Sequence, residues 1–383
     1  MLTAEGCATR RKRLRDSLPA ACDLILITEP HQLIYFANFV QSPFVFRSCE
    51  ATAVLAILPD RAILFADNVQ KAFSARAHVD EVSTVEWYNG KESAPHRRAN
   101  LNRHVAERLA TLSAKRIGVE KSSVPSELID AALNGKARSA ETVVDLDSII
   151  RKMRRFKDQD EMVVMRRSMK AGEAGLAAAL EHARPGMTEL DVYLLVQNAA
   201  FHDLGEQAIV YGDFASGPRC ETERGGPPTN RVIEPGDLMI IDYSVIVDGY
   251  RGDFTNTFVI GGEPTPGQVD LYKACMGSIE AGEKALGPNV PCKDVDAALR
   301  GYLARLNLDQ YYPSHGGHGL GLGHPDPPYI VTRSNETLLP GDVVALEPGL
   351  YIQGVGGMRF ERNYLITESG YETLSHHRLT LTK

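Results

Sequence analysis

Short apolar runs separated by polar turns dominate the first part of the chain and predict alternating strands and helices. The pattern at 99–112 repeats at helical spacing, whereas five shorter runs have the length and β-branched content of strands. These strands are predicted at 23–28, 51–58, 61–66, 82–87 and 116–119. Alternation of this kind is typical of a small α/β domain, which we expect to span residues 1–147.

The pattern becomes helical between Ser148 and His182 and ends at Pro185-Gly186. A polar run at 151–161 marks the junction between two domains. At 383 residues the chain is longer than one ordinary hydrophobic core supports. We therefore predict a second domain at 148–383.

Two acidic residues of the second domain are predicted to lie side by side on a hairpin. Apolar strands flank Asp248-Gly249, which is a strong signal for a two-residue turn. If these two residues form the turn, Asp253 faces Ser244, and Asp242 becomes its diagonal neighbour on the same face. Two ionised carboxylates held this close repel one another unless a cation lies between them.

A second segment repeats this arrangement. Residues 340–347, like 235–242, consist of Pro-Gly-Asp, a short apolar strand and an acid, which suggests a faint internal duplication. Glu347 precedes Pro348, and Glu361 lies on a return strand after a glycine-rich bend. A bend centred on Gly354 places the two glutamates opposite each other.

Histidines and glycines lie between the two hairpins, at 314–324. Glycines allow close approach of the backbone to a ligand, and His315, His318 and His324 offer imidazole nitrogens. A single acid in a strand is usually a hydrogen-bonded structural residue, but four acids and a histidine in apolar surroundings favour a metal site. Oxygen ligands with one imidazole suit Mn²⁺, Co²⁺, Fe²⁺ or Zn²⁺.

Composition and charge narrow the possible functions. The net charge of −7 gives no electrostatic footprint for nucleic acid. The six cysteines contain no CxxC pair, which argues against a disulfide framework and a structural zinc site. Neither a signal peptide nor an apolar run long enough to span a bilayer is evident. We expect a cytoplasmic protein with no membrane partner.

The motifs, taken in order, resemble the pita-bread metallopeptidase family, which includes methionine aminopeptidase, aminopeptidase P, prolidase and the metal-free creatinase. They are Asp242-x₁₀-Asp253, the His318-Gly-Leu-Gly segment, Glu347-Pro-Gly and Arg359-Phe-Glu361. The likeness extends to residues 31–39 and to the polar run 151–161, so it covers most of the chain. The resemblance implies an α+β protein: a pita-bread catalytic domain preceded by a smaller creatinase-type α/β domain, as in the two-domain Xaa-Pro peptidases.

The resemblance also implies a ligand set and a mechanism. Asp253 and Glu361 would bridge two metal ions, Asp242 would bind one ion, and His318 and Glu347 would bind the other. A hydroxide shared by the ions, with manganese favoured, would attack a peptide carbonyl, and Glu347 would be the general base. His324 and His315 would stabilise the oxyanion, and Arg359 would orient Glu361 or a substrate carboxylate, with a structural ion pair as the alternative for Arg359. A homodimer is also implied.

Two departures from the family pattern bear on specificity. The family commonly has a substrate-contacting histidine about a dozen residues before Asp237, where this chain has Gly225. The helper histidine usually follows the metal-binding histidine by seven residues, whereas His324 follows His318 by six.

Three functions follow as hypotheses. The first is an Xaa-Pro aminopeptidase-like or dipeptidase-like enzyme that cleaves small peptides. The second is a metal-dependent C–N hydrolase of a non-peptide small molecule, which the missing histidine favours. The third is a binding module on the same fold, against which the intact set of five ligands argues.

Overall fold

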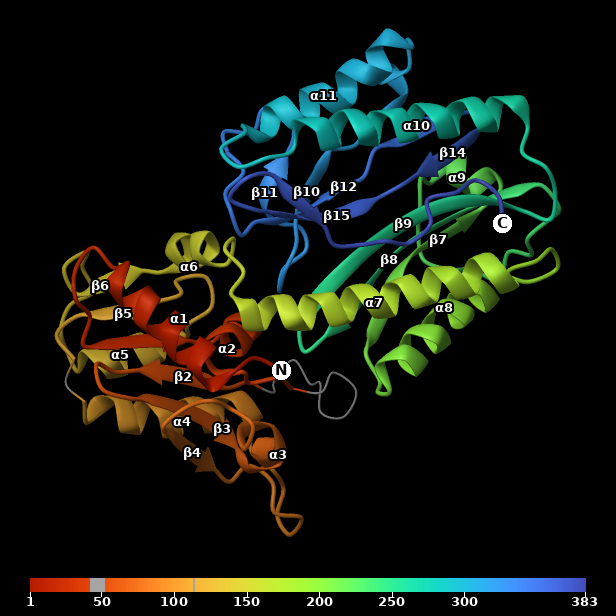
Figure 1. Cartoon of the computed structure of the whole chain (residues 1–383). Helices are drawn as coiled ribbons and strands as arrows, with labels where there is room; N and C mark the ends of the chain where they lie inside the picture. The colour runs from red at the N-terminus through yellow and green to blue at the C-terminus, as the bar shows by residue number, and fades with distance from the viewer. Residues whose placement is uncertain (42–51, 113) are drawn as a thin grey trace. The chain divides into compact units, whose positions relative to one another are not determined.

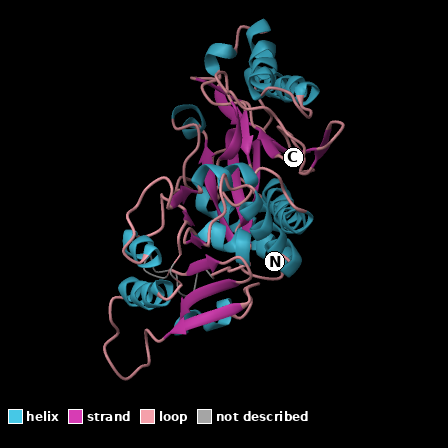
Figure 2. Ribbon diagram, turned by 90° about the vertical axis from the view of Figure 1, so that its left-hand side faces the viewer, coloured by secondary structure: helices cyan, strands magenta, loops and turns pink. Residues whose placement is uncertain are grey.

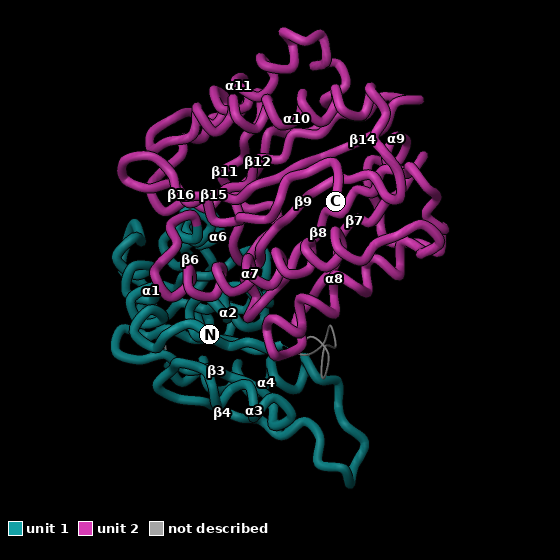
Figure 3. The backbone as a smooth tube through the Cα atoms, turned by 45° about the vertical axis from the view of Figure 1, so that its right-hand side comes forward, with its two compact units in different colours: residues 1–154 teal, residues 155–383 magenta. Residues whose placement is uncertain are grey.

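The structure, a computed structural model, describes residues 1–41, 52–112 and 114–383. The chain divides into two compact units, residues 1–154 and 155–383 (Figure 3). The short helix that follows Leu146 groups with the first unit, and the domain boundary at Asp147 stays a prediction. Both units combine helices and strands (Figure 2), so the predicted mixture of α and β structure is confirmed.

The first unit is built on a six-stranded sheet in the order β4-β3-β2-β1-β5-β6. The β1–β2 and β2–β3 pairs are antiparallel, and the other pairs are parallel. Its strands are β1 (Leu24–Ile27), β2 (Val54–Ile57), β3 (Ala62–Asp67), β4 (Glu81–Val85), β5 (Ile117–Val119) and β6 (Val143–Asp145). Its helices are α1 (Ala4–Asp16), α2 (Pro30–Ala37), η1 (Asn68–Gln70), α3 (Lys71–Ser74), α4 (Arg97–Ala110), α5 (Ser126–Leu133) and α6 (Asp147–Met153).

These elements confirm the predicted strands and the helix of the first unit to within a few residues. The predicted strand 51–58 begins at Ala51, which lies outside the described residues, as does Cys49. The remaining five cysteines are buried, and no disulfide joins them. Leu101, Val105 and Leu109 recur at intervals of four along α4 and pack in the core beside β1 and β3.

The second unit contains three sheets: antiparallel β7-β8-β9, antiparallel β11-β10-β12-β15-β16 and the hairpin β13-β14. Its strands are β7 (Ile209–Ser216), β8 (Asp237–Val247), β9 (Tyr250–Ile260), β10 (Gly317–Gly319), β11 (Asp326–Ile330), β12 (Val343–Leu346), β13 (Gly349–Ile352), β14 (Gly356–Arg359), β15 (Arg362–Ile366) and β16 (Tyr371–Thr373). Its helices are α7 (Gln159–His182), α8 (Glu189–Leu204), α9 (Pro218–Thr222), α10 (Pro266–Ala285), α11 (Cys292–Arg305) and η2 (Asp309–Tyr311).

Two pairs of long helices cover the strands of the second unit. Helices α7 and α8 lie along β7, β8 and β9, and α10 and α11 lie on the other side, over β12 and β14 (Figure 1). Leu271, Cys275 and Ile279 recur at helical spacing on α10 and enter a core that also contains side chains of α11, β12 and β14. The strands that carry the candidate acids are therefore packed between two helical layers.

No helix among the described residues combines the length and the apolar character that crossing a membrane requires.

Candidate metal centre

The first candidate acids lie on the β8–β9 hairpin. Asp248-Gly249 forms the turn, and Ser244 pairs with Asp253, which confirms the predicted register. Asp253 is 4% exposed, and the Ser244 hydroxyl donates a hydrogen bond to Asp253 Oδ1 at 3.2 Å. Because side chains two residues apart in a strand share a face, Asp242 and Asp253 point the same way.

The second pair of acids lies in an interruption of another long hairpin. Leu346 pairs with Arg362 on one side of the gap, and Gly349 pairs with Arg359 on the other. Both pairings have the register of a bend centred on Gly354, as predicted, and this register sets Glu347 against Glu361. The Glu347 N–H donates to Gly316 O and the Glu361 N–H to Thr255 O, so neighbouring strands hold both backbones.

His318 lies on β10, and the glycine before it lets this strand approach β12 closely. Gly317 has φ of +157°, and a Cβ at this position would lie 1.8 Å from Ala345 O. Any side chain would push β10 away from β12. The ring nitrogen Nδ1 of His318 lies 3.0 Å from Gly319 O, which leaves Nε2 directed at the acids.

The five predicted ligands converge in space. Ligand atoms of Asp242, Asp253 and Glu361 lie within 4.8 Å of one another. His318 Nε2 lies 3.0 Å from Glu347 Oε1 and 3.8 Å from Asp253 Oδ2. Asp253 is therefore close to Asp242 and Glu361 and also to His318.

Crowding of these carboxylates affects their protonation. Burial, reinforced by the charges of Asp253 and Glu347, raises the pKa of Asp242 to about 7, although Arg359 opposes this. Burial and the same neighbouring acids raise the pKa of Glu361 well above its usual range. Negative groups packed this closely need protons or cations between them.

Imidazoles have the opposite effect on the other two acids. Burial raises the pKa of Asp253 and of Glu347, but the hydrogen bonds and charges of His324 and His318, respectively, outweigh it and leave both pKa values lowered. Burial lowers the pKa of His318, yet its contact with Glu347 raises the value to about 9. These acids are thus poised in the ionised form that a metal ligand requires.

The residues present fit a divalent metal centre. Glu361 Oε2 accepts a hydrogen bond from the Thr255 hydroxyl at 2.8 Å, while its buried Oε1 has no partner among the described residues. A buried carboxylate oxygen without a donor is costly unless a ligand satisfies it. Four carboxylates and one imidazole form a mixed oxygen and nitrogen donor set for which Mn²⁺, Co²⁺, Fe²⁺ and Zn²⁺ are suited.

The two further histidines both border the centre. His324 Nε2 lies 2.8 Å from Asp253 Oδ2. His315 lies 3.6 Å from Glu347 Oε1, and burial together with nearby positive charges lowers its pKa. The three imidazoles form a row, with centroid distances of 5.5 Å from His315 to His318 and 4.8 Å from His318 to His324.

Arg359 forms its closest ion pair with one of the candidate acids. Among the described residues its guanidinium forms an ion pair with Asp242 and not with Glu361, and it donates to the Tyr351 hydroxyl at 2.7 Å. This contact is a structural ion pair of the kind given as the alternative role of Arg359, and its role toward Glu361 or a substrate carboxylate stays a prediction.

The site opens into a cavity of about 210 Å³. Its walls include four of the five predicted ligands and both additional histidines. They are formed by Tyr211, Gly212, Asp213, Asp242, Tyr243, Ser244, Asp253, His315, His318, His324, Pro325 and Glu347. A larger surface groove of about 520 Å³ lies beside α11, is lined by residues such as Lys293 and Arg300, and contains none of the predicted ligands.

Asp213 and Tyr351 are residues of the site that sequence reasoning missed. Asp213 lies on β7 directly opposite Asp242, and its Oδ2 is 3.4 Å from Arg359 Nη2. An acid inside the otherwise apolar run of β7 was the available signal. Tyr351 gave no such signal, because a tyrosine in a strand most often fills the core.

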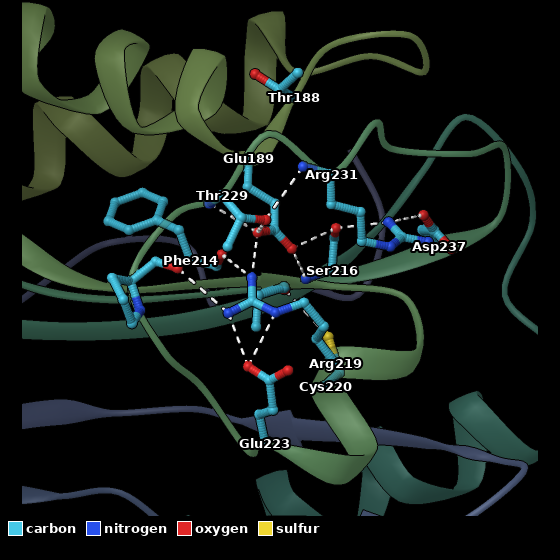
Figure 4. A network of polar contacts seen from close by, with 12 residues as sticks. Thr188, Glu189, Phe214, Ser216, Arg219, Cys220, Glu223, Thr229, Arg231 and Asp237 are labelled. Carbon is cyan, nitrogen blue, oxygen red and sulfur yellow. Dashed lines mark hydrogen bonds and ion pairs between the residues drawn. The ribbon is translucent and has the colours of Figure 1, made fainter.

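A buried network holds the segment beside β7 in place. The Glu189 carboxylate accepts hydrogen bonds from the backbone and hydroxyl of Ser216, both at 2.8 Å, and from those of Thr229 at 3.0 and 2.6 Å. It also forms an ion pair with Arg219 (Figure 4). Glu189 thereby links α8, the end of β7 and the loop that includes Gly225.

Comparison with known families agrees with this geometry. Residues 163–368 match metallopeptidase family M24, and residues 10–156 match the creatinase/prolidase N-terminal domain. The chain belongs to metallopeptidase family M24. Among curated relatives of this M24 protein are uncharacterised peptidases from Staphylococcus aureus, strains USA300 and NCTC 8325 / PS 47. Each is 28% identical over 238 residues, or 61% of this chain and 66% of the relative, slightly less than two thirds of its length.

Solved structures share the fold over nearly the whole chain. The Xaa-Pro dipeptidase from Bacillus anthracis aligns with a TM-score of 0.82 and 24% identity, covering 98% of this chain and 99% of the other. The X-Pro aminopeptidase from Thermotoga maritima MSB8 aligns with a TM-score of 0.81 and 22% identity, covering 97% and 99%. The expected fold, a pita-bread domain preceded by a creatinase-type N-terminal domain, is confirmed.

Proposed function

We propose that this M24 protein is a two-metal peptidase that hydrolyses small peptides or dipeptides in the manner of an Xaa-Pro aminopeptidase or dipeptidase. The observation that carries the proposal is the convergence of Asp242, Asp253, His318, Glu347 and Glu361 from five separate segments onto one cluster, four members of which line a single cavity. These five side chains would hold two divalent ions, with Mn²⁺ favoured because the donors are mostly carboxylate oxygens.

Each group of residues in the site has a separate role in the proposed reaction. When bound, a pair of divalent ions lowers the pKa of a water molecule and polarises the attacked carbonyl. Glu347 is the general base: it takes a proton from the attacking water and passes it to the leaving nitrogen as the C–N bond breaks. His324 and His315, which lie beside Asp253 and Glu347, would stabilise the oxyanion, and Arg359 would hold Asp242 or bind a substrate carboxylate.

One observation favours the second candidate, a metal-dependent C–N hydrolase of a non-peptide compound. Gly225 provides no side chain where related peptidases commonly place a substrate-contacting histidine. This candidate uses the same metal set and the same base, and differs only in the substrate. The cytoplasmic location and the homodimer stay predictions.

The test is hydrolysis of a short peptide panel, with and without proline at the second position. Protein reloaded with Mn²⁺ or Co²⁺ is compared with a chelated sample and with Asp253→Asn. Cleavage by the reloaded protein alone is expected. If the panel stays intact although two ions are bound per chain, the peptidase proposal fails and the non-peptide hydrolase takes its place.

A further inference from the structure

One carboxylate in the cavity lies outside the proposed metal set. Asp213 shares a face of the β7–β8 ladder with Asp242, its direct partner. Its side chain is 42% exposed, whereas the side chain of Asp253 is 5% exposed. Asp213 is therefore a solvent-accessible negative charge on the wall of the cavity, one strand away from the proposed ligands.

Arg359, the cationic side chain in contact with Asp213, directs its closer contacts to other groups. Arg359 Nη1 donates to the Tyr351 hydroxyl at 2.7 Å and to Arg224 O at 3.1 Å, and Nη2 forms the close ion pair with Asp242. Asp213 receives a longer contact of 3.4 Å from Nη2 and has no other side-chain partner among the described residues. Asp213 lines the cavity, and a carboxylate can accept more hydrogen bonds than this one contact.

Gly225 provides the space that the Asp213 carboxylate fills. A Cβ at position 225 would lie 2.2 Å from Asp213 Oδ2, and the φ of +148° also disfavours any other residue. The loop is fixed in this position, because the Phe214 N–H donates to Gly226 O at 2.8 Å and Glu189 holds Thr229. A side chain at 225 and the carboxylate of Asp213 exclude one another.

From this arrangement, and resting on the proposed function, we propose that Asp213 determines specificity by binding a cationic side chain of the substrate. Neighbouring strands lie about 4.8 Å apart, so β7 is two spacings from β9 and its Asp253. An ammonium or guanidinium on a side chain suits that separation better than an α-ammonium, which is two bonds from the attacked carbonyl. The chemistry selected is a peptide whose first residue is arginine or lysine.

The test compares arginine with citrulline, its neutral isostere, as the first residue of otherwise identical dipeptides. The Mn²⁺-loaded protein is expected to show kcat/KM at least about tenfold higher for the arginine peptides. Asp213→Asn is expected to bring this ratio close to one, because kcat/KM should fall far more for the arginine peptides than for the citrulline peptides. Glu206→Gln, which removes an exposed charge of the same unit, is the matched control.

Gly225→Ala is a second variant, since it displaces the Asp213 carboxylate without removing a charge, and it should lower the same ratio. An unchanged ratio in Asp213→Asn overturns the specificity role and leaves the peptidase proposal standing. If the loaded wild type cleaves no peptide, the peptidase proposal fails separately, and calorimetric titration with argininamide and citrullinamide decides the role of Asp213. Weaker argininamide binding in Asp213→Asn then supports the role, and equal binding, or none in the wild type, overturns it.

Discussion

Glu347 and Glu361 lie opposite each other in a gap of one antiparallel hairpin, between the pairs Leu346–Arg362 and Gly349–Arg359. In this gap their backbone N–H groups bond to other strands, at Gly316 and Thr255. The hairpin register therefore brings the two carboxylates together, while the neighbouring strands bring His318 and Asp253 to them.

Glu361→Gln should abolish stable binding of two metal ions. The amide keeps the shape of the side chain but removes the negative charge, and its NH₂ group cannot act as a ligand. Metal content after dialysis, measured by mass spectrometry, is expected to fall from two ions per chain, and hydrolysis should fall with it. Glu368→Gln, an exposed change in a nearby turn, should leave both unchanged. Retention of two ions by Glu361→Gln would contradict the ligand set.

Thr255→Val should weaken metal binding without touching a ligand. The Thr255 hydroxyl donates to Glu361 Oε2, and loss of such an orienting hydrogen bond typically costs about 10–100-fold in metal affinity. Titration of the chelated protein with Mn²⁺ measures the effect. Thr222→Val, an exposed change on α9, serves as the control, and equal affinities in the two variants would rule out this role for Thr255.

Glu347→Gln should lower kcat by about 10²–10⁴-fold even at saturating Mn²⁺, because the amide cannot accept the proton of the attacking water. Steady-state kinetics at increasing Mn²⁺ separate this loss from weaker metal binding. Full recovery of kcat at high Mn²⁺ would show that Glu347 is a ligand only and that another group is the base.

The chelated protein should lose stability as the pH rises from about 6.5 to 9. The pKa of His318 is raised to about 9 in the fold, above the value of about 6.5 in an unfolded chain. The stabilisation that protonated His318 contributes to the fold is thus complete below about pH 6.5 and is lost as the pH rises through about 9. The raised pKa of Asp242, about 7, acts in the same direction but at lower pH, because its effect is complete once the pH passes 7.

Thermal melts of the chelated wild type across this range measure the loss, and His318→Asn should show a smaller slope. Added Mn²⁺ should stabilise the protein more strongly at the upper end of the range, because the ion competes with protons for the same groups. A Tm of the chelated protein that rises steadily with pH would contradict the assignment.

Glu189→Gln should destabilise the second unit by about 3–5 kcal/mol. The change leaves Arg219 without its buried anionic partner. It also places the NH₂ group of the glutamine against groups that donate hydrogen bonds to Glu189, such as the Ser216 N–H. Urea denaturation gives the difference in free energy of unfolding. Glu223→Gln removes the other, half-exposed partner of Arg219 and should cost about 1 kcal/mol or less. Similar losses in the two variants would show that burial of Glu189 is not the source of its effect.

The sequence alone determined those features that local geometry controls. Asp248-Gly249 forms the turn of a hairpin, so the positions of Asp242 and Asp253 on one face follow from a period of two. The bend at Gly354 similarly sets Glu347 against Glu361. Within a hairpin, the position of the turn sets the register of the two strands, and the register decides which side chains lie opposite each other.

Contacts between separate segments could not be predicted from local patterns and came from the folded structure. The pairing of Arg359 with Asp242, and the fit of Asp213 into the space left by Gly225, join side chains from different hairpins and a loop. These contacts depend on how Glu189 anchors the loop (Figure 4) and on how the strands pack between the helices (Figure 1). No local period encodes that packing, since it arises from the burial of many apolar side chains at once.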